Sequence, residues 1–475
     1  MDYTKFYIDG EWVDPVTPKP LDVINPATEE PCATISDASV QDAEKAIMSA
    51  RKAFPAFSRT TKAERLDLLR NLLAAFEARS EDIAQAISRE MGSPITFART
   101  VQTKVVGAGR IEETIAALEE FEEETTSRTG ATKIVRQPIG VCAMITPWNY
   151  PINQIAQKAF PALAVGCTMV VKPSVLAPLD AVILAECIHE AGYPPGVFNL
   201  IQGEGAEVGQ YMASHKEVDF VSLTGSVRAG SAVAKAAADS VKRVTLELGG
   251  KSPNVIFSDA DLAKAAKWGV SRVMANSGQT CTAPTRMLVE KSVYDQVVDL
   301  AAKAGEATEV GDPSVEGNHI GPVVSKAQYE RVQAYIEKGI EEGARLVTGG
   351  PGRPEGTNRG YFVRPTIFAD VTNDMTIARD EIFGPVLSII PFDGEDDAIQ
   401  IANDTPYGLA AHVFTGDPEK AQRVALSIDS GMVGINGVNQ GLDAPFGGFK
   451  QSGNGREGSL WGLEEYTEIK TIAGV

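Results

Sequence analysis

The first hundred residues combine a hairpin pattern with helical repeats. Residues 6–13 (FYIDGEWV) place Asp-Gly between two short apolar runs, and this dipeptide suits the type I′ turn of a β-hairpin. Apolar residues then recur at helical spacing over 43–53. Thr61 and Glu64 form a capping-box pattern in front of a leucine-rich stretch. The pattern therefore predicts one hairpin followed by helices.

From Ile139 onward, short apolar runs alternate with helical patterns. Strands are predicted at 141–145, 169–171, 197–201, 218–223, 244–248, 254–257, 288–290, 386–391 and 410–414. Helices are predicted at 152–165, 181–191, 229–237, 262–274, 292–304, 326–342 and 396–403. Gly192 and Gly305 follow predicted helices, in the position of a C-terminal cap. This alternation indicates an α/β protein with mostly parallel sheets. Two isolated strands are expected at 133–136 and 468–472.

The acidic balance of the chain narrows the classes of partner. Its 475 residues contain 44 Lys and Arg against 63 Asp and Glu, which gives a net charge of −19. Such a charge repels phosphate backbones and anionic lipid surfaces, so we expect neither a nucleic-acid nor a membrane partner. The length predicts two to four domains with a large core.

Cysteine and histidine usage indicates a reducing compartment without a zinc site. The five cysteines include no CxxC pair, and the four histidines form no metal-binding motif. The first residues lack the apolar core of a signal peptide. The most apolar stretch, 159–171, is too short to span a bilayer. We therefore expect a cytoplasmic protein.

One cysteine has neighbours unlike those of the others. Cys281 follows a predicted helix within the small, polar stretch 277–282 (SGQTCT). Exposed backbone N–H groups in such a loop can lower a thiol pKa, and the resulting thiolate is a nucleophile. The alternative is a buried structural cysteine. Cys142 and Cys167, inside apolar strand patterns, fit that alternative.

Two polar residues follow predicted strands, at the edge where open α/β sheets hold their sites. Glu247 stands before two glycines, and a partly desolvated carboxylate there can act as a base. Asn149 lies between Pro147 and Pro151, which fix the backbone so that its amide can donate to an oxyanion. The alternatives are a solvated strand end and a proline-rich turn beside a core tryptophan.

Two glycine patterns are candidates for phosphate binding. Gly203-x-Gly205-x-x-x-Gly209 is one residue longer than the dinucleotide fingerprint. Residues 224–230 (TGSVRAG) follow a strand and open a helix, which suits a pyrophosphate at a helix N-terminus. Either pattern alone is weak, because 44 glycines make chance matches common.

Seven motifs, taken in order, give the chain a resemblance to a known family. They are Pro147-Trp148-Asn149, Lys172-Pro173-Ser174, Thr224-Gly225-Ser226, residues 246–251 (LELGGK), residues 278–281 (GQTC), residues 381–385 (EIFGP) and residues 445–457 (PFGGFKQSGNGRE). Together they resemble the aldehyde dehydrogenase superfamily along nearly the whole chain. The resemblance implies oxidation of an aldehyde to a carboxylic acid with NAD or NADP.

The resemblance also assigns roles to single residues. Cys281 would be the nucleophile that forms a thiohemiacetal and then a thioester. Asn149 and the backbone N–H of Cys281 would hold the oxyanion. Glu247 would activate the water that hydrolyses the thioester.

A larger set of residues is implied around the cofactor and the substrate, and no metal is implied. The cofactor residues would be Ile145, Thr146, Trp148, Lys172, Ser174, Val175, Gly205, Gly209, Gly225, Ser226, Leu248, Glu381 and Phe383. The substrate pocket would consist of Tyr150, Asn153, Gln154, Met274, Thr280, Thr282 and Phe446. The polar residues after Tyr150 indicate a partly polar or roomy pocket, which leaves the aldehyde itself unassigned.

The family architecture implies three parts. A Rossmann-like dinucleotide-binding domain would use residues 1–120 and 139–249, and an α/β catalytic domain would use residues 250–449. A small β oligomerisation extension would use residues 121–138 and 450–475. It would pair between subunits of a homodimer or homotetramer, because the tail strand has nothing local to pair with.

Two further points concern cofactor choice and reaction type. Val175, three residues after Lys172, stands where many NAD-specific members have glutamate. Without a carboxylate to repel a 2′-phosphate, we expect NADP to be accepted as well as NAD. A CoA-acylating or phosphorylating semialdehyde dehydrogenase typically lacks the residue at the place of Glu247. A non-catalytic protein on this fold would have lost the nucleophile, and Cys281 is present.

Overall fold

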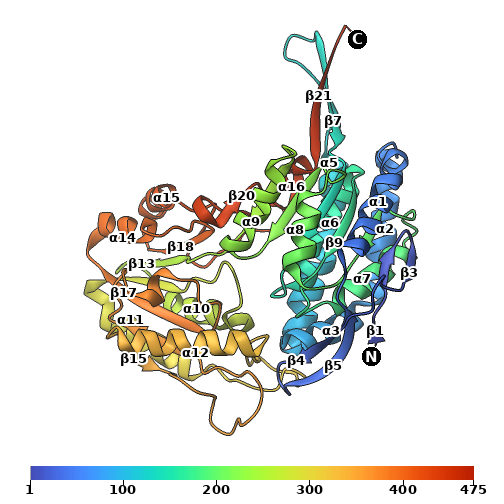
Figure 1. Ribbon diagram of the computed structural model, residues 1–475. Coiled ribbons are helices and arrows are strands. Elements are labelled where there is room, and N and C mark those ends of the chain that lie inside the picture. The colour runs from blue at the N-terminus through green and yellow to red at the C-terminus, as the bar shows by residue number, and fades with distance from the viewer. Residues whose placement is uncertain (1, 475) are drawn as a thin grey trace.

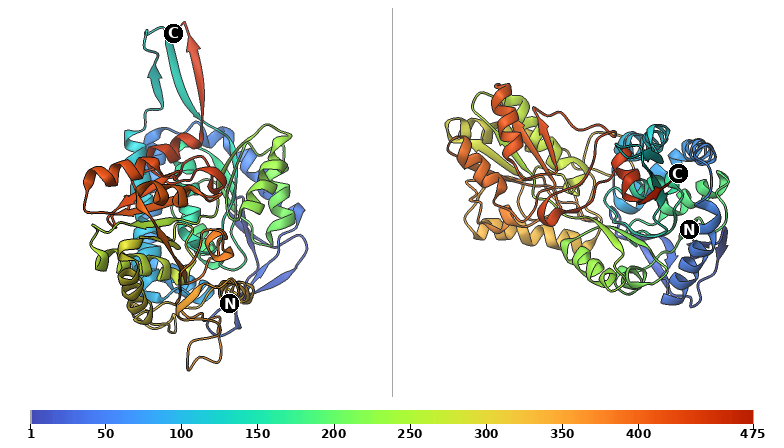
Figure 2. Two further views of the ribbon diagram at one scale, coloured as in Figure 1. Left: turned by 90° about the vertical axis from the view of Figure 1, so that its left-hand side faces the viewer. Right: turned by 90° about the horizontal axis from the view of Figure 1, so that it is seen from above.

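Two α/β lobes and a projecting β arm make up the computed structural model, which describes residues 2–474 (Figures 1 and 2). In Figure 1 the lobe on the right is coloured blue to green, and the lobe on the left yellow to orange. Each lobe is built on its own sheet. The arm stands out from the body beside the C-terminus.

The first lobe contains an eight-stranded sheet in the order β20-β12-β11-β8-β9-β10-β2-β3. Its parallel core consists of β8 (Val141–Ile145), β9 (Thr168–Lys172), β10 (Phe198–Leu200), β11 (Phe220–Thr224) and β12 (Arg243–Glu247). Numbered along the chain, these five strands lie in the order 3-2-1-4-5. This is the order of a Rossmann-like sheet, whose topological switch point here lies between β8 and β11.

Helices cover both faces of this sheet, because successive strand residues point to opposite sides. Cys142 and Met144 of β8 pack into one core, and Val141 and Ala143 pack into the other. The helices of this lobe are α1 (Val40–Phe57), α2 (Lys62–Ala78), α3 (Ser80–Met91), α4 (Ile95–Phe97), the π-helix η1 (Ala98–Ala108), α5 (Gly109–Glu120), α6 (Pro151–Val165), α7 (Leu179–Glu190), α8 (Gly205–Ser214) and α9 (Val227–Ala238). The predicted capping box at Thr61 is confirmed at the start of α2.

The N-terminal hairpin is confirmed, and the all-helical expectation after it is wrong. β2 (Phe6–Ile8) pairs with β3 (Glu11–Val13), and Asp9 and Gly10 have φ of 55° and 81°, as a type I′ turn requires. β1 (Asp2–Tyr3), β4 (Pro20–Asn25) and β5 (Glu30–Ser36) form a separate three-stranded sheet. β4 and β5 mix exposed, half-buried and buried positions, so they lack the apolar runs that identify strands buried on both faces.

The second lobe contains a seven-stranded sheet in the order β15-β16-β17-β14-β13-β18-β19. Its strands are β13 (Pro253–Ile256), β14 (Arg286–Glu290), β15 (Arg345–Thr348), β16 (Thr366–Ala369), β17 (Val386–Phe392), β18 (Ala410–Phe414) and β19 (Met432–Ile435). All pairings are parallel except that of β15, at one edge. The helices are α10 (Leu262–Met274), η2 (Ala275–Gly278), η3 (Lys291–Val293), α11 (Tyr294–Glu306), α12 (Lys326–Glu341), α13 (Thr376–Arg379), α14 (Gly394–Asn403) and α15 (Pro418–Ser427).

The two glycines predicted as helix caps differ. Gly192 follows Ala191, the C-cap residue of α7, with φ of 86°, as predicted. Gly305 lies inside α11, so the prediction of a cap there is wrong. A Cβ at Gly305 would stand 2.7 Å from Ile367 Cδ1, so this glycine allows the helix to pack closely on β16.

The arm is a three-stranded antiparallel sheet of β6 (Glu124–Thr126), β7 (Thr132–Pro138) and β21 (Thr467–Ala473). The tail strand β21 pairs along its length with β7, so the expectation that it has no local partner is wrong. The extension is also narrower than expected, because η4 (Lys450–Ser452) and β20 (Gly453–Asn454) lead back to the first lobe, where β20 pairs with β12. α16 (Ser459–Glu465) then packs on α5 and α6. Within residues 2–474 no helix is long and apolar enough to cross a membrane.

Candidate active site

Asn149 is fixed at the C-terminal end of β8 by the loop that carries Cys281. Its side chain is buried, and its Nδ2 donates to the Gln279 carbonyl oxygen at 3.1 Å. Asn276 Nδ2 in turn donates to the Asn149 carbonyl oxygen at 2.8 Å. An amide nitrogen carries two hydrogens, so one N–H of Asn149 is held by Gln279 and the other is left to act on a ligand.

The loop before Cys281 has an uncommon backbone. Asn276, Ser277 and Gly278 have φ of 54°, 57° and 75°, three left-handed residues in succession. Such a conformation persists only where its surroundings fix it. Ser277 Oγ donates to the Gly321 carbonyl oxygen at 2.7 Å, and Gln279 Oε1 accepts from Val324 N at 2.8 Å. The predicted GQTC segment is therefore a rigid, buried support for the cysteine.

Cys281 is partly exposed and lies where three of the sequence motifs meet. A Cβ at Gly250 would stand 2.5 Å from the Cys281 carbonyl oxygen, so the glycine lets the loop after β12 approach. Burial raises the pKa of the Cys281 thiol to about 12, and the carboxylates of Glu381 and Glu247 add to this shift. The backbone N–H groups of Cys281 and Thr282 act in the opposite direction. The thiol is thus protonated at neutral pH until a substrate arrives.

Glu247, the last residue of β12, is a buried carboxyl group with both oxygens free. It is 4 % exposed, and neither oxygen has a hydrogen-bond partner among residues 2–474. Burial raises its pKa well above the usual range, followed by the carboxylate of Glu457, while Lys158 and Arg456 lower it. Glu457 itself forms a buried ion pair with Lys158. A carboxyl group with a raised pKa and free lone pairs is suited to accept a proton from water.

The switch point between β8 and β11 offers polar groups to a ligand. Thr146 and Thr224, at the ends of these strands, have buried hydroxyl groups without a partner in residues 2–474. Beside them, Ser226 caps α9 by accepting from Ala229 N at 3.2 Å, and Gly225 N donates to the Glu247 carbonyl oxygen at 2.9 Å. Leu248 packs on α9 at Gly230. These groups fit the phosphates of a dinucleotide at a helix N-terminus.

Lys172, the last residue of β9, places an amino group at the same end of the sheet. Its Nζ donates to the Gly203 and Pro173 carbonyl oxygens at 2.9 and 3.0 Å, and burial lowers its pKa to about 8. Added Cβ atoms at Gly205 and Gly209 would stand 3.8 Å from Lys172 Nζ and 3.4 Å from Ile145 Cδ1. Without side chains at these two positions, the space next to Lys172 and Ile145 stays open.

Ser174 and Val175 lie on the loop that follows β9. The Ser174 hydroxyl accepts from Leu176 N at 3.2 Å. Val175 is partly buried and packs against the core of the first lobe. Neither side chain carries a negative charge that would repel a phosphate.

Glu381 and Phe383 enter the crevice from the second lobe. Glu381 Oε1 accepts from Gly250 N at 3.1 Å, and burial raises the pKa of this carboxyl group to about 7. Phe383 has φ of 61°, and its ring lies 5.4 Å from that of Trp148 in a T-shaped arrangement. The two lobes therefore meet over the end of β8, with a hydrogen-bond acceptor and an aromatic pair. Together with the switch-point groups, these residues fit a nicotinamide dinucleotide.

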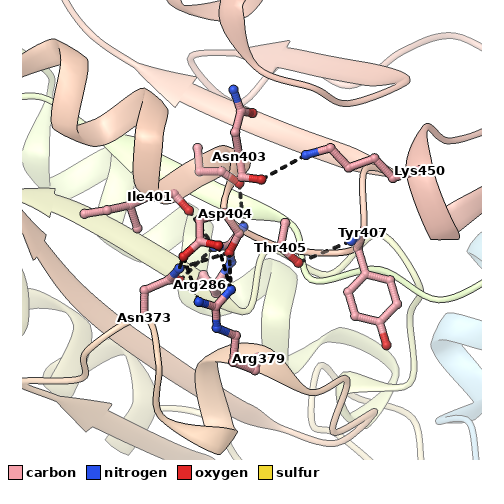
Figure 3. A network of polar contacts seen from close by, with 10 residues as sticks. Arg286, Asn373, Arg379, Ile401, Asn403, Asp404, Thr405, Tyr407 and Lys450 are labelled. Atoms are coloured by element: carbon pink, nitrogen blue, oxygen red, sulfur yellow. Dashed lines mark hydrogen bonds and ion pairs between the residues drawn. The ribbon is translucent and has the colours of Figure 1, made fainter.

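A polar network in the second lobe joins Arg286, Asn373, Arg379 and Asp404 (Figure 3). Arg286 is buried and donates to the Lys251 carbonyl oxygen at 3.0 Å and to Asn373 Oδ1 at 3.0 Å. Asn373 Nδ2 donates to Asp404, which pairs with Arg379 at 2.7 Å. Arg379 lies two residues before Glu381. Sequence motifs gave no sign of this network, because its members are common residue types far apart in the chain.

A cavity of about 370 Å³ also reaches Cys281, and none of the predicted cofactor residues lines it. Six predicted substrate residues line it: Tyr150, Asn153, Gln154, Thr280, Thr282 and Phe446. Met274 does not line it; its neighbour Ala275 does, so the assignment of Met274 is corrected. Met274 ends α10 and lines a second cavity instead, because the backbone turns into η2 between the two residues.

Sequence reasoning missed several lining residues of the first cavity. They come from the π-helix η1 (Val101, Val105, Val106), from α5 and α10 (Arg110, Arg272), from β18 (His412) and from the loop after β19 (Val438, Asn439, Gln440, Leu442). None belongs to one of the seven motifs.

Comparisons with known proteins agree with this geometry. Residues 12–472 match the aldehyde dehydrogenase family. The 3-succinoylsemialdehyde-pyridine dehydrogenase of a Pseudomonas species is 50% identical over 473 residues, which cover 100% of this chain and 99% of that protein. Aldehyde dehydrogenase of Bartonella henselae has a TM-score of 0.98 and 50% identity, with 100% and 99% of the two chains covered.

Two similar solved structures were determined with ligands. Aldehyde dehydrogenase C of Pseudomonas syringae, in a complex with NAD+ and octanal, has a TM-score of 0.97 and 49% identity over 99% of this chain and 96% of that chain. The Mycobacterium tuberculosis enzyme, in a complex with NAD+, has a TM-score of 0.96 and 40% identity over 100% and 98% of the chains. The chain described here belongs to the aldehyde dehydrogenase family.

Proposed function

We propose that this aldehyde dehydrogenase converts an aldehyde to the carboxylic acid through a thiohemiacetal and a thioester on Cys281, with NAD or NADP as cofactor. One observation carries the proposal. Cys281, the free amide N–H of Asn149 and the unpartnered carboxyl group of Glu247 meet between a cavity of about 370 Å³ and a dinucleotide crevice. A nucleophile, an oxyanion donor and a base are the three groups that this chemistry needs.

The first step forms a bond between Cys281 Sγ and the carbonyl carbon, and the thiol proton passes to solvent. The carbonyl oxygen becomes an oxyanion, held by Asn149 Nδ2 and by the backbone N–H of Cys281. The backbone N–H groups of Cys281 and Thr282 stabilise the thiolate as it develops, which partly offsets the raised pKa of the buried thiol.

The cofactor would bind at the switch point between β8 and β11, on the side of the first lobe that faces Glu381 and Phe383 of the second lobe. Lys172, Ser174, Val175, Gly205, Gly209, Gly225 and Ser226 would hold its adenosine and pyrophosphate side, and Ile145, Thr146, Trp148, Leu248, Glu381 and Phe383 its nicotinamide side. When bound, it accepts the hydride that the carbonyl carbon loses. The NAD+ complexes of the P. syringae and M. tuberculosis enzymes support this assignment.

Hydrolysis completes the cycle. Glu247 takes a proton from a water molecule, whose oxygen attacks the thioester carbon. The carbon–sulfur bond breaks, and Cys281 regains its proton as the acid leaves. Because the Glu247 pKa is raised, the base form becomes more abundant as pH rises, and we expect hydrolysis to speed up in that direction.

The domain division and the assembly also remain proposals. We infer that the sheet of β8 to β12 carries the cofactor-binding domain, that the sheet of β13 to β19 carries the catalytic domain and that the arm joins two or four copies of the chain. A cytoplasmic location stays a prediction from cysteine usage.

The experiment is to follow reduced nicotinamide absorbance for the purified protein with a panel of aldehydes, in wild type and Cys281→Ala. We expect oxidation to be lost in the variant with the fold intact by circular dichroism, and the product to be the free acid without added CoA or phosphate. Residual turnover within about tenfold of wild type would remove Cys281 from the mechanism.

A further inference from the structure

The cavity that ends at Cys281 has a charge opposite to that of the chain. The protein carries a net charge of −19, yet neither Asp nor Glu is among the residues that line this cavity. Two arginines, Arg110 and Arg272, do line it. Because the chain has more Asp and Glu than Lys and Arg, its composition alone does not explain why, within residues 2–474, the only charged residues that line this cavity are arginines. A low-dielectric cavity with one sign of charge attracts ligands of the opposite sign.

Arg110 is the more deeply buried of these two cations and has only neutral partners. It is 9% exposed, its Nε donates to Asn153 Oδ1 at 3.4 Å and its Nη1 donates to the Leu442 carbonyl oxygen at 3.3 Å. Within residues 2–474 it forms no ion pair. Burial lowers its pKa, and the carboxylates of Glu457 and Glu113 act in the opposite direction from a distance. Glu457 is paired with Lys158, so it acts on Arg110 only from a distance and does not contact it.

An unsatisfied donor, on Gln157, is linked to Arg110 through Asn153. Gln157 is 4% exposed, and its Nε2 has no partner among residues 2–474. Its Oε1 accepts from Asn153 Nδ2 at 3.0 Å, so Arg110, Asn153 and Gln157 form one chain of side chains along the cavity wall. A buried charge and a buried donor left without acceptors both cost free energy. A ligand that brings acceptor oxygens removes both costs.

Arg272 differs from Arg110 in its surroundings. It is only partly buried and lies over the Trp268 ring at 6.0 Å. Its charge is therefore better solvated and already has an aromatic partner. It contributes to the positive field of the cavity, and Arg110 is the group that lacks a counterion.

We propose that the substrate is an aldehyde with a carboxylate at its far end, an oxo acid, and that Arg110 binds this carboxylate. Gln157 Nε2 donates to the same group, and Asn153 orients both side chains. The inference rests on the proposed function, because it names the substrate class of that site. It makes Arg110 a specificity residue for the cavity that ends at Cys281.

The test compares matched substrates in matched variants. We would measure kcat and KM with 4-oxobutanoate against butanal and with 6-oxohexanoate against hexanal, in wild type, Arg110→Met, Arg110→Lys and Arg272→Met. In wild type, one oxo acid should exceed its alkanal in kcat/KM by about tenfold or more. Arg110→Met should lower that oxo-acid value about thirtyfold, mainly through KM, and leave the alkanal within about threefold. Arg110→Lys should recover part of the loss, and Arg272→Met should change the ratio by less than about fivefold.

The outcomes separate this proposal from the mechanism. If wild type prefers the alkanal at both chain lengths, or if Arg272→Met removes the preference and Arg110→Met does not, the proposal is overturned. A loss of both activities in Arg110→Met, with an unchanged thermal midpoint, would overturn it too, because a carboxylate contact cannot affect butanal. Should Arg110→Met fail to fold, Gln157→Leu must lower the oxo-acid preference for the proposal to stand. Absence of aldehyde oxidation in wild type would instead contradict the proposed function.

Discussion

At the scale of single residues, the site depends on groups that are buried and incompletely satisfied. Glu247 has two free carboxyl oxygens, and Asn149 has one amide hydrogen not held by the protein. Each unsatisfied group lowers the stability of the protein without substrate, and each gains a hydrogen-bond partner only during the reaction: the attacking water for Glu247 and the oxyanion for Asn149. The Asn149 side chain is held by the Gln279 carbonyl oxygen, and its backbone carbonyl by Asn276 Nδ2.

Replacing Asn149 by alanine should lower turnover more than affinity. The amide meets a negative charge that develops only after attack by Cys281. Loss of one oxyanion donor typically removes roughly 2.7–4 kcal/mol of transition-state stabilisation, so we expect kcat to fall about a hundredfold to a thousandfold. Steady-state kinetics with one good aldehyde measure this, with the thermal midpoint as a control for the lost Gln279 contact. A change confined to KM would argue against the oxyanion role.

Cofactor preference is a second prediction at this scale. Val175 offers no carboxylate to repel a 2′-phosphate, and Lys172 Nζ at the end of β9 lies near Gly205 at the start of α8. We expect kcat/KM for NAD and NADP to differ by less than about a hundredfold, and Val175→Glu to shift the ratio toward NAD by about tenfold. Both cofactors are to be measured in both proteins. Rejection of NADP by a thousandfold in wild type, or an unmoved ratio in the variant, would show that another residue discriminates.

Residues inside motifs could be predicted, and residues outside them could not. Cys281, Glu247 and Asn149 each lie within three residues of a glycine or proline, whose backbone constraints leave a sequence signature. Arg110 reaches the cavity only because η1 and α5 bring it there. The sequence could not show which of two cavities the end of α10 faces: Met274 lines only the second cavity, whereas Ala275 lines both.

At the scale of elements, strands buried on both faces were predictable and exposed strands were not. β8 and β9 are continuous apolar runs, whereas β4 and β5 mix exposed and buried positions without a clear alternation. The π-helix η1 was not predictable, because a π-helix shares its composition with an α-helix. Val101, Val105 and Val106 of η1 line the cavity that reaches Cys281.

The loop before Cys281 allows a prediction with a matched control. Gly278 has φ of 75°, and a Cβ there would overlap the Gly384 carbonyl group. We expect Gly278→Ala to lower the free energy of unfolding by more than about 2 kcal/mol and to abolish most activity, since the loop must shift. Gly192 has φ of 86° with nothing within 4 Å of an added Cβ. Gly192→Ala should cost only about 1 kcal/mol and leave kcat unchanged.

Urea unfolding midpoints and kcat, measured for both glycine variants, check this account of the loop. Equal losses of stability in the two variants, with normal activity in Gly278→Ala, would show that the close approach to Gly384 does not position Cys281.

At the scale of the whole molecule, the arm is the part of the chain that projects from the body and is not packed against either lobe along most of its length. Its three strands project from the body, and Ile469 on β21 is 68% exposed (Figure 2). β21 lies at the edge of the sheet, where unpaired backbone groups can accept a strand or a sheet of another copy. The intrachain pairing with β7 was not expected, because 132–138 and 467–473 are far apart in sequence.

We therefore expect the protein to have a mass in solution of at least twice 50.5 kDa by light scattering. Ile469→Asp should shift the population toward the monomer, because it places a charge on the exposed face of β21. A substitution away from the arm, Leu426→Asp at an 81% exposed position, should leave the mass unchanged. A wild-type mass of one chain would contradict the assembly.

The central claim is that the reaction passes through a thioester on Cys281 that Glu247 hydrolyses. Intact-mass spectrometry of Glu247→Gln, mixed with an aldehyde and cofactor, tests it most directly. The glutamine keeps the shape of the side chain and cannot take a proton from water, so the acyl group should remain on the protein. We predict one added acyl mass, mapped to Cys281 by peptide digestion and absent from the double variant Cys281→Ala, Glu247→Gln. If Glu247→Gln slows acylation as much as hydrolysis and no adduct is trapped, Glu247 activates the thiol and the account of hydrolysis is wrong.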